Sequence, residues 1–107
     1  MSTYVVRLAH TADVCPTANS KVRERVIGGA ADIPKIAEQT GVKIVTGPLV
    51  MASEHESVVV VEAAGAEAVN DFVLRTGLIQ WNSVRVSFAE PLAQALGHIN
   101  EMPPPIY

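Results

Sequence analysis

The sequence is short of charge, of aromatic side chains and of basic clusters, and each shortage excludes a class of protein. Charged residues make up 18% of the 107 residues, whereas an average soluble domain has about a quarter. Disorder is excluded because 49% of the residues are hydrophobic and the net charge is only -3. Basic residues are scattered except for Lys21, Arg23 and Arg25, and no basic stripe is interleaved with aromatic residues, so we expect no nucleic-acid partner.

Long hydrophobic runs, a leader segment and paired cysteines are also missing. No apolar stretch approaches the roughly 18 residues that a membrane span needs, so we expect no membrane partner. The first residues show no basic segment before an apolar core, which predicts a cytoplasmic protein without a signal peptide. The single cysteine, Cys15, cannot form an internal disulfide, so it is a packed residue, a reactive thiol or a ligand.

The apolar residues that are present are mostly valine, alanine, leucine and isoleucine, in patterns typical of short strands and helices. Four valines in a row at 58–61 indicate a strand, and residues 83–88 alternate between apolar and polar. Pro48 predicts that the strand around it is bulged or lies at an edge. The predicted elements are a strand over 4–10, a helix from 21 interrupted by Gly28-Gly29, a helix over 32–40, a strand over 42–52, a strand over 58–61, a helix over 67–76 and a strand over 83–88.

This order predicts an α+β fold, the ferredoxin-like βαββαβ arrangement with a four-stranded antiparallel sheet. Right-handed crossovers place the strands in the order 4-1-3-2, with the helices on one face. Because the valines at 58–61 are apolar on both faces of the sheet, we expect a homodimer packed sheet to sheet. Arg7 and Arg85 fall on the face without helices, where they would form interface ion pairs or bind an anionic ligand.

The chain divides into a domain and a tail. We expect one ferredoxin-like domain over residues 1–92 and a proline-rich C-terminal tail over residues 93–107. The last part, Glu101–Tyr107, contains three consecutive prolines and should be extended. This tail either lies across the partner subunit or is disordered.

The residues His10-x-x-x-x-Cys15-Pro16 follow directly after the first predicted strand, and His55 precedes the third. The motif is similar to that of a group of small, largely uncharacterised bacterial proteins. The element order, the size and the apolar second face resemble the dimeric α+β barrel superfamily over residues 3–90. That resemblance implies a dimeric barrel but no particular reaction, because the superfamily includes monooxygenases, haem-handling proteins, isomerases and binding proteins.

Topology gathers polar residues at one end of the predicted sheet. His10 ends the first strand, His55 precedes the third, and Trp81-Asn82 precede the fourth; Cys15 lies on the loop that leaves the first strand. Two imidazoles and a thiolate suit zinc, copper or iron and leave a coordination position open. A cysteine thiolate can also be the axial ligand of haem. The leading hypothesis is a metal or haem site at His10, Cys15 and His55, with small-molecule chemistry at the open position.

Other interpretations remain open. Cys15 could be the nucleophile of a metal-free thiol site, with His10 or His55 as its base and Asp13 orienting that base. The chain could instead be a cofactor-independent enzyme of the barrel type, or a passive binding protein for a small apolar ligand. Each residue also has a structural explanation. Cys15 could be a packed residue, His10 a histidine satisfied within the sheet, and His55 an exposed turn histidine. Trp81 could pack between the last predicted helix and the fourth strand.

Overall fold

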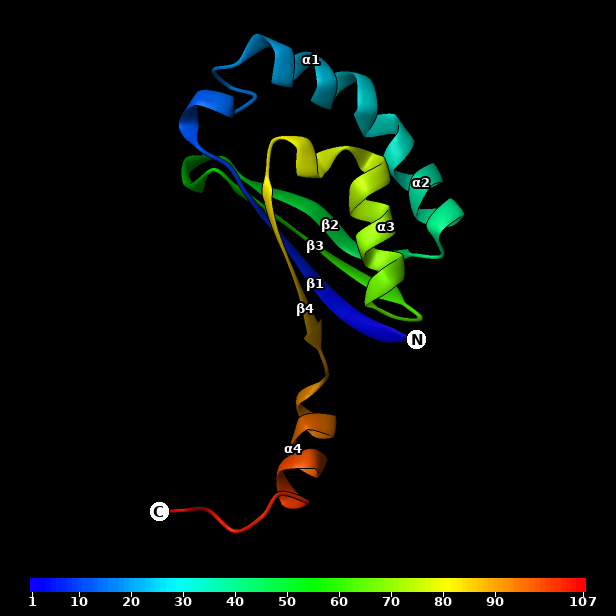
Figure 1. Cartoon of the computed structure of the whole chain (residues 1–107), viewed down its shortest axis with the longest axis vertical. Coiled ribbons are helices and arrows are strands. Elements are labelled where there is room, and N and C mark those ends of the chain that lie inside the picture. Colours follow the sequence, from blue (N-terminus) through cyan, green and yellow to red (C-terminus); the bar gives the residue numbers. More distant parts are fainter.

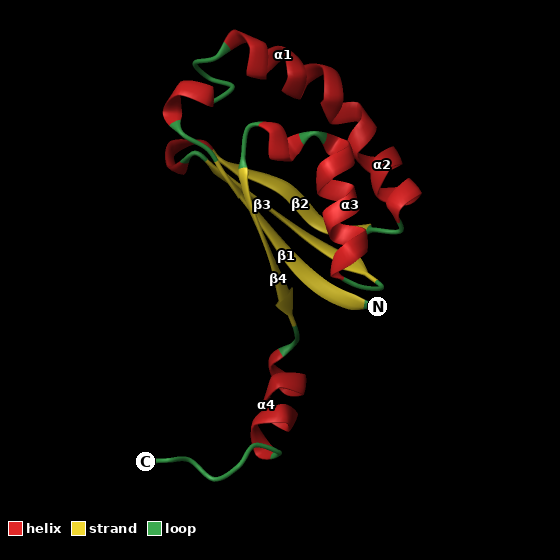
Figure 2. Cartoon of the chain, viewed as in Figure 1, coloured by secondary structure: helices red, strands yellow, loops and turns green.

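Four strands form one antiparallel sheet in the computed structural model, which describes all residues 1–107 (Figures 1 and 2). The order β2-β3-β1-β4 is the predicted order read from the opposite edge. The predicted α+β class is therefore confirmed, and the architecture is compatible with a ferredoxin-like fold. The strands are β1 (Ser2–Ala9), β2 (Lys43–Met51), β3 (Glu56–Ala63) and β4 (Ser83–Ala89), and the α-helices are α1 (Ser20–Gly29), α2 (Ile33–Thr40), α3 (Ala66–Thr76) and α4 (Leu92–Asn100).

The core lies between the sheet and the helices. Alternate side chains of β1, Val6 and Leu8 among them, are almost completely buried, and so is Val59 on the neighbouring strand β3. Phe72 of α3 packs onto this surface and is 1% exposed. Each fully buried side chain of this size contributes roughly 1.5–3 kcal/mol. The opposite face of the sheet carries no helix, so the chain covers only one face (Figure 1).

The first helical segment differs from the predicted one. Asn19 caps α1 by accepting a hydrogen bond from the Val22 amide at 3.1 Å. The predicted interruption at Gly28-Gly29 is wrong, because α1 runs through both glycines to Gly29. Glycine weakens a helix interior by about 1 kcal/mol without preventing it. The break comes one residue later, in a single 3₁₀ turn at Ala30–Asp32 that leads into α2.

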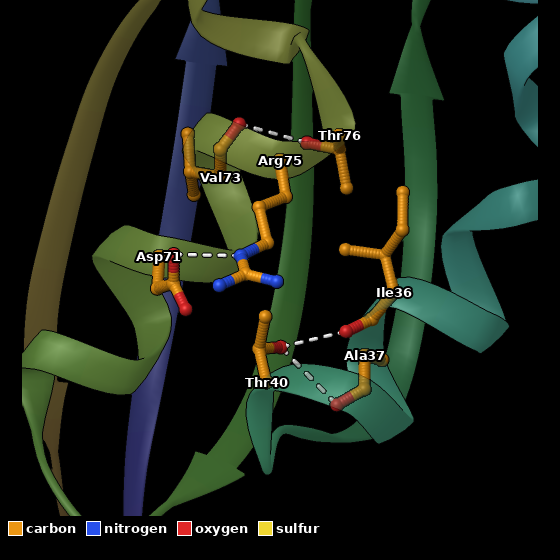
Figure 3. Close-up of polar contacts among 7 residues, drawn as sticks. All are labelled: Ile36, Ala37, Thr40, Asp71, Val73, Arg75 and Thr76. Carbon is orange, nitrogen blue, oxygen red and sulfur yellow. Dashed lines mark hydrogen bonds and ion pairs between the residues drawn. The ribbon is translucent and has the colours of Figure 1, made fainter.

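Helices α2 and α3 lie side by side over the sheet (Figure 3). In each helix a threonine hydroxyl in the last turn donates back to the helix backbone: Thr40 to the Ile36 carbonyl at 2.8 Å, and Thr76 to the Val73 carbonyl at 2.9 Å. Both helices then end at a glycine with positive φ, at the ends predicted for the helices over 32–40 and 67–76. These ends fix where β2 and the segment before β4 begin.

Strand β2 is an irregular edge strand, as Pro48 predicted. Its pairing with β3 shifts register twice, between Ile44 and Thr46 and between Thr46 and Leu49. Gly47 has a φ of 95°, and a Cβ at this position would lie 2.8 Å from the Val58 carbonyl oxygen. Only glycine fits this close approach.

The C-terminal region contains a helix that the sequence did not predict. Residues 92–100 form α4, which projects away from the sheet, while residues 101–107 have no regular structure, as expected (Figure 1). Leu92, Leu96 and Ile99 of α4 are all more than half exposed. None of the helices combines the length and apolar character that crossing a membrane requires.

Candidate metal centre

The fold brings His10, Cys15 and His55 together at one end of the sheet. His10 directly follows β1, and His55 lies between a 3₁₀ turn (Ala52–Glu54) and β3. Cys15 follows the 3₁₀ turn at Ala12–Val14. Each residue offers one potential ligand atom, and these atoms all lie within 4.8 Å of one another. The predicted convergence of these three residues is therefore present.

Backbone pairing sets the two histidines opposite each other. The β1–β3 ladder ends at the pair Ala9 and Glu56, and the His10 amide then donates to the His55 carbonyl at 3.0 Å. His55 adopts a left-handed conformation with φ 54°, a region that histidine enters more readily than most residues. The two rings meet edge to face, with centroids 5.5 Å apart. Their placement therefore follows from strand register as well as from side-chain packing.

Asn82 fixes the orientation and tautomer of His10. The Asn82 amide nitrogen donates to the Leu78 carbonyl at 2.9 Å, so its oxygen is the atom that faces His10 Nδ1 at 3.2 Å. Since an amide oxygen can only accept, Nδ1 carries a proton, and in the neutral ring Nε2 keeps its lone pair. This arrangement, an imidazole held by a hydrogen bond at one nitrogen and free at the other, is characteristic of metal-ligating histidines.

A network of backbone contacts holds the loop that carries Cys15. The Cys15 carbonyl accepts from the Ala18 and Asn19 amides at 2.9 and 2.8 Å. The Arg23 guanidinium donates to the Pro16 carbonyl at 2.8 Å and to the Thr17 carbonyl at 2.7 Å. These contacts link the loop to α1. The Cys15 side chain is only 3% exposed as a result.

The Cys15 thiol is strongly acidic in this setting. A hydrogen bond from the Thr17 hydroxyl, with the two atoms 3.0 Å apart, is the largest influence. The Thr17 amide, His10 and His55 act in the same direction, and burial opposes them. Together they lower the pKa of Cys15 to about 6. The thiolate is therefore the main form at pH 7, and the thiolate is the form that acts as a ligand or a nucleophile.

Two imidazole nitrogens at the site have no partner. His10 Nε2 and His55 Nδ1 are buried and make no hydrogen bond. Buried polar atoms in folded proteins are nearly always paired, and an unpaired one costs about 1–3 kcal/mol. Two such nitrogens beside a thiolate form a donor set of the kind that transition metals accept.

Trp81 separates two hollows next to the cluster. A shallow cleft of about 450 Å³ reaches His10 and Asn82 along the end of the sheet, and Trp81 lines it. Trp81 also lines an apolar cavity of about 370 Å³ beneath α1 and α2. The indole lies against His10, with ring centroids 5.1 Å apart. The site thus has access to solvent on one side and an apolar surface on the other.

Asp13 and His98 lie in different surroundings. Asp13 accepts a hydrogen bond from the Thr11 hydroxyl, which lowers its pKa, so Asn82 and not Asp13 orients His10. His98 is exposed on α4, where it contacts Glu90 at 3.0 Å. Sequence reasoning missed Thr17, although a hydroxyl two residues after Cys15 was a usable signal.

The sequence comparisons found no relative of this chain. No protein-family model matches the chain, and no curated protein matches its sequence. The resemblance to the dimeric α+β barrel superfamily therefore stays a prediction.

Proposed function

We propose that this chain is a cytoplasmic metal-binding protein in which His10, Cys15 and His55 hold one transition-metal ion. The observation that carries the proposal is the pair of buried, unpartnered imidazole nitrogens beside an acidic thiol. A metal ion satisfies both nitrogens at once and requires the thiolate form that Cys15 already favours.

The donor set suits a bare ion. Metal–nitrogen bonds of about 2.0–2.1 Å and metal–sulfur bonds of about 2.3 Å bring the ligand atoms of one zinc ion to less than about 4 Å apart. The spread of up to 4.8 Å in the chain closes with small side-chain rotations. Zinc or copper is favoured over iron, since thiolate with imidazole is a donor set that both accept readily. Haem is disfavoured because the three donors converge on one point.

Three protein ligands would leave one coordination position open. A bound ion of this kind supplies Lewis acidity and can activate a water molecule. The chain contributes the remaining elements: Asn82 keeps His10 in one tautomer, Trp81 shields one side from water, and the cleft at His10 admits small molecules. These features support small-molecule chemistry at the open position.

A second candidate function is a metal-free thiol site. The observation that favours it is the pKa of Cys15 of about 6, which makes the thiolate available without a metal. In this alternative Cys15 is the nucleophile, and His10 accepts or donates a proton through Nε2. Metal affinity separates the two functions, since the thiol site predicts none.

We also propose that the uncovered face of the sheet pairs with a second copy of the chain. Arg7 and Arg85 lie directly opposite each other on that face, and neither has an acidic partner. Like charges in this position repel. Glu56 and Glu62 lie on the same face, on β3. A twofold-related copy would set each pair of arginines against acidic residues of the other subunit.

Titration of metal-stripped protein with Co²⁺ tests the metal-binding function. We expect a thiolate-to-cobalt absorption band at one equivalent, lost in Cys15→Ser and weakened in His10→Ala and His55→Ala. His98→Ala is the matched control, because that histidine is exposed and distant in the fold. A band that is absent, or that persists in Cys15→Ser, would contradict the proposal.

A further inference from the structure

The apolar cavity beneath α1 and α2 is separate from the cleft at His10. Its volume of about 370 Å³ falls in the range of small-molecule sites, about 300–1,000 Å³. The helix-facing side of the sheet forms its floor. The apolar side chains that line it include Leu8, Val26, Ile33, Ile44, Leu78 and Trp81.

The lining defines the chemistry of the ligand that fits. Ser57 and Thr76 are small uncharged polar residues in the wall, and no carboxylate lines the cavity. Arg25 is the only charged residue of the lining, and its guanidinium already donates to Gln80. A cationic ligand would thus find no partner of opposite sign, and an anionic ligand would find only the exposed Arg25. The walls select a compact, uncharged and mainly apolar molecule.

The cavity has a route of entry along α1. No residue of α1 is buried, and Ile27 is 73% exposed. The contact between Arg25 and Gln80 joins α1 to the 3₁₀ turn at Leu78–Gln80. A helix with so little buried surface can move outward at a low free-energy cost. A ligand can therefore enter beneath α1 without opening the core.

Three elements connect the cavity with the metal site. Leu8 and His10 project from the same side of β1, and Leu8 lines the cavity. Ser57 lines it on β3, two residues after His55. Trp81 lines the cavity and also lies against the His10 ring. A ligand filling the cavity would therefore lie against Trp81, whose other side contacts the His10 ring.

We infer that this cavity is the ligand pocket of the His10, Cys15 and His55 site and takes a compact, uncharged apolar molecule. Its role as a substrate pocket rests on the proposed metal-binding function, whereas its occupancy does not. The pocket lies within one chain, so it is distinct from any space between two copies.

Binding of the uncharged fluorescent probe N-phenylnaphthylamine to the full chain tests the inference. Trp81 is the only tryptophan, so energy transfer from protein to probe reports binding beside it. Gly29 lines the cavity and Gly28 does not, and a Cβ at either position meets no atom within 4 Å. We expect Gly29→Leu to weaken probe affinity by about tenfold, because its side chain takes volume that the probe needs. Gly28→Leu is the matched control and should leave affinity unchanged.

A second cavity-filling variant and the metal-free proteins complete the design. Val26→Phe should act as Gly29→Leu does, from another position on the same wall. Probe binding should persist in metal-stripped protein and in Cys15→Ser, which separates the pocket from metal affinity. In protein loaded with Co²⁺, the probe should shift the visible spectrum of the metal, since Trp81 lines the pocket and also lies against the His10 ring.

The inference is overturned if the probe shows no energy transfer from Trp81, or if folded Gly29→Leu and Val26→Phe bind it as tightly as the original chain. Probe binding that leaves the Co²⁺ spectrum unchanged would also overturn it, by showing a cavity independent of the site. Co²⁺ binding without probe binding would leave the metal-binding function intact. Probe binding without Co²⁺ binding would instead favour passive binding of an apolar ligand.

Discussion

At the residue scale, the acidity of Cys15 is the most specific property of the site. The thiolate can be followed by its ultraviolet absorbance, which does not depend on access of a reagent to a buried group. In metal-free protein we predict a titration midpoint of about 6. Thr17→Val should move it up toward the ordinary value of about 8.5, because the largest stabilising hydrogen bond is lost.

The matched control is Thr11→Val, since the Thr11 hydroxyl contacts Asp13 and not Cys15. A midpoint near 8.5 in the original chain would contradict the account.

Ionisation of Cys15 also makes the stability of the fold depend on pH. Because the folded pKa lies below the unfolded one, the thiolate stabilises the fold fully above about pH 8.5. This contribution is lost as the pH falls through about 6.

Asn82 provides a second prediction at this scale. Its amide fixes His10 with Nε2 free, so Asn82→Leu should reduce metal affinity by about 10–100-fold while His10 remains in place. Competition with a chromophoric chelator measures the change. The exposed neighbour Ser83 is the control position, and Ser83→Ala should bind as the original chain does. Equal affinity in Asn82→Leu and Ser83→Ala would show that Asn82 does not position the ligand.

The residues of the cluster were predictable from the sequence, but their partners were only partly so. His10, His55 and Cys15 followed from strand order, because antiparallel pairing brings the end of one strand to the start of its neighbours. Asn82 was predicted to lie nearby, but its hydrogen bond to His10 was not predicted. The Thr17 hydroxyl bond depends on the conformation of one loop, which residue type and spacing do not determine.

At the scale of elements, Arg23 connects helix α1 with the loop that carries Cys15. Its two hydrogen bonds to the Pro16 and Thr17 carbonyls hold the backbone beside the thiolate. We predict that Arg23→Leu accelerates hydrogen exchange at residues 15–19 and lowers metal affinity by about tenfold. Lys21→Leu, on the same exposed helix, should change neither. Protection of the loop that survives in Arg23→Leu would rule out this role.

The ends of helices were predicted well where the backbone conformation of a single glycine determines them. The positive φ of Gly41 and Gly77 ended α2 and α3 where expected. Two elements were wrong or missed. Gly28-Gly29 does not break α1, because glycine only weakens a helix. The helix at 92–100 was missed because the prolines that follow it led us to predict a tail for the whole segment.

At the scale of the whole molecule, the uncovered sheet face predicts association. Val58 lies on that face, half-buried and pointing away from the helices. Val58→Lys should leave the fold intact but convert a dimer into a monomer, since it buries an unpaired charge in the interface. Ala31→Lys adds the same charge on the exposed helical side and should remain dimeric. Sedimentation velocity distinguishes the mass of one chain from that of two; a monomeric original chain would contradict the dimer.

Although charged residues make up only 18% of the chain, Arg7, Arg85, Glu56 and Glu62 all lie on the sheet face that the helices leave open. The sequence could predict that such a face exists, because residues 58–61 are apolar on both sides of their strand. The sequence alone does not identify a partner for this face.

Elemental analysis of the protein purified without a histidine tag tests the central claim most directly. We predict about one equivalent of zinc or copper per chain, held through Cys15 and the two imidazoles. The Cys15→Ser variant should retain the fold and lose the metal, whereas His98→Ala should keep it. Less than about a tenth of an equivalent of any transition metal in the original chain, or equal metal content in Cys15→Ser, would contradict the account.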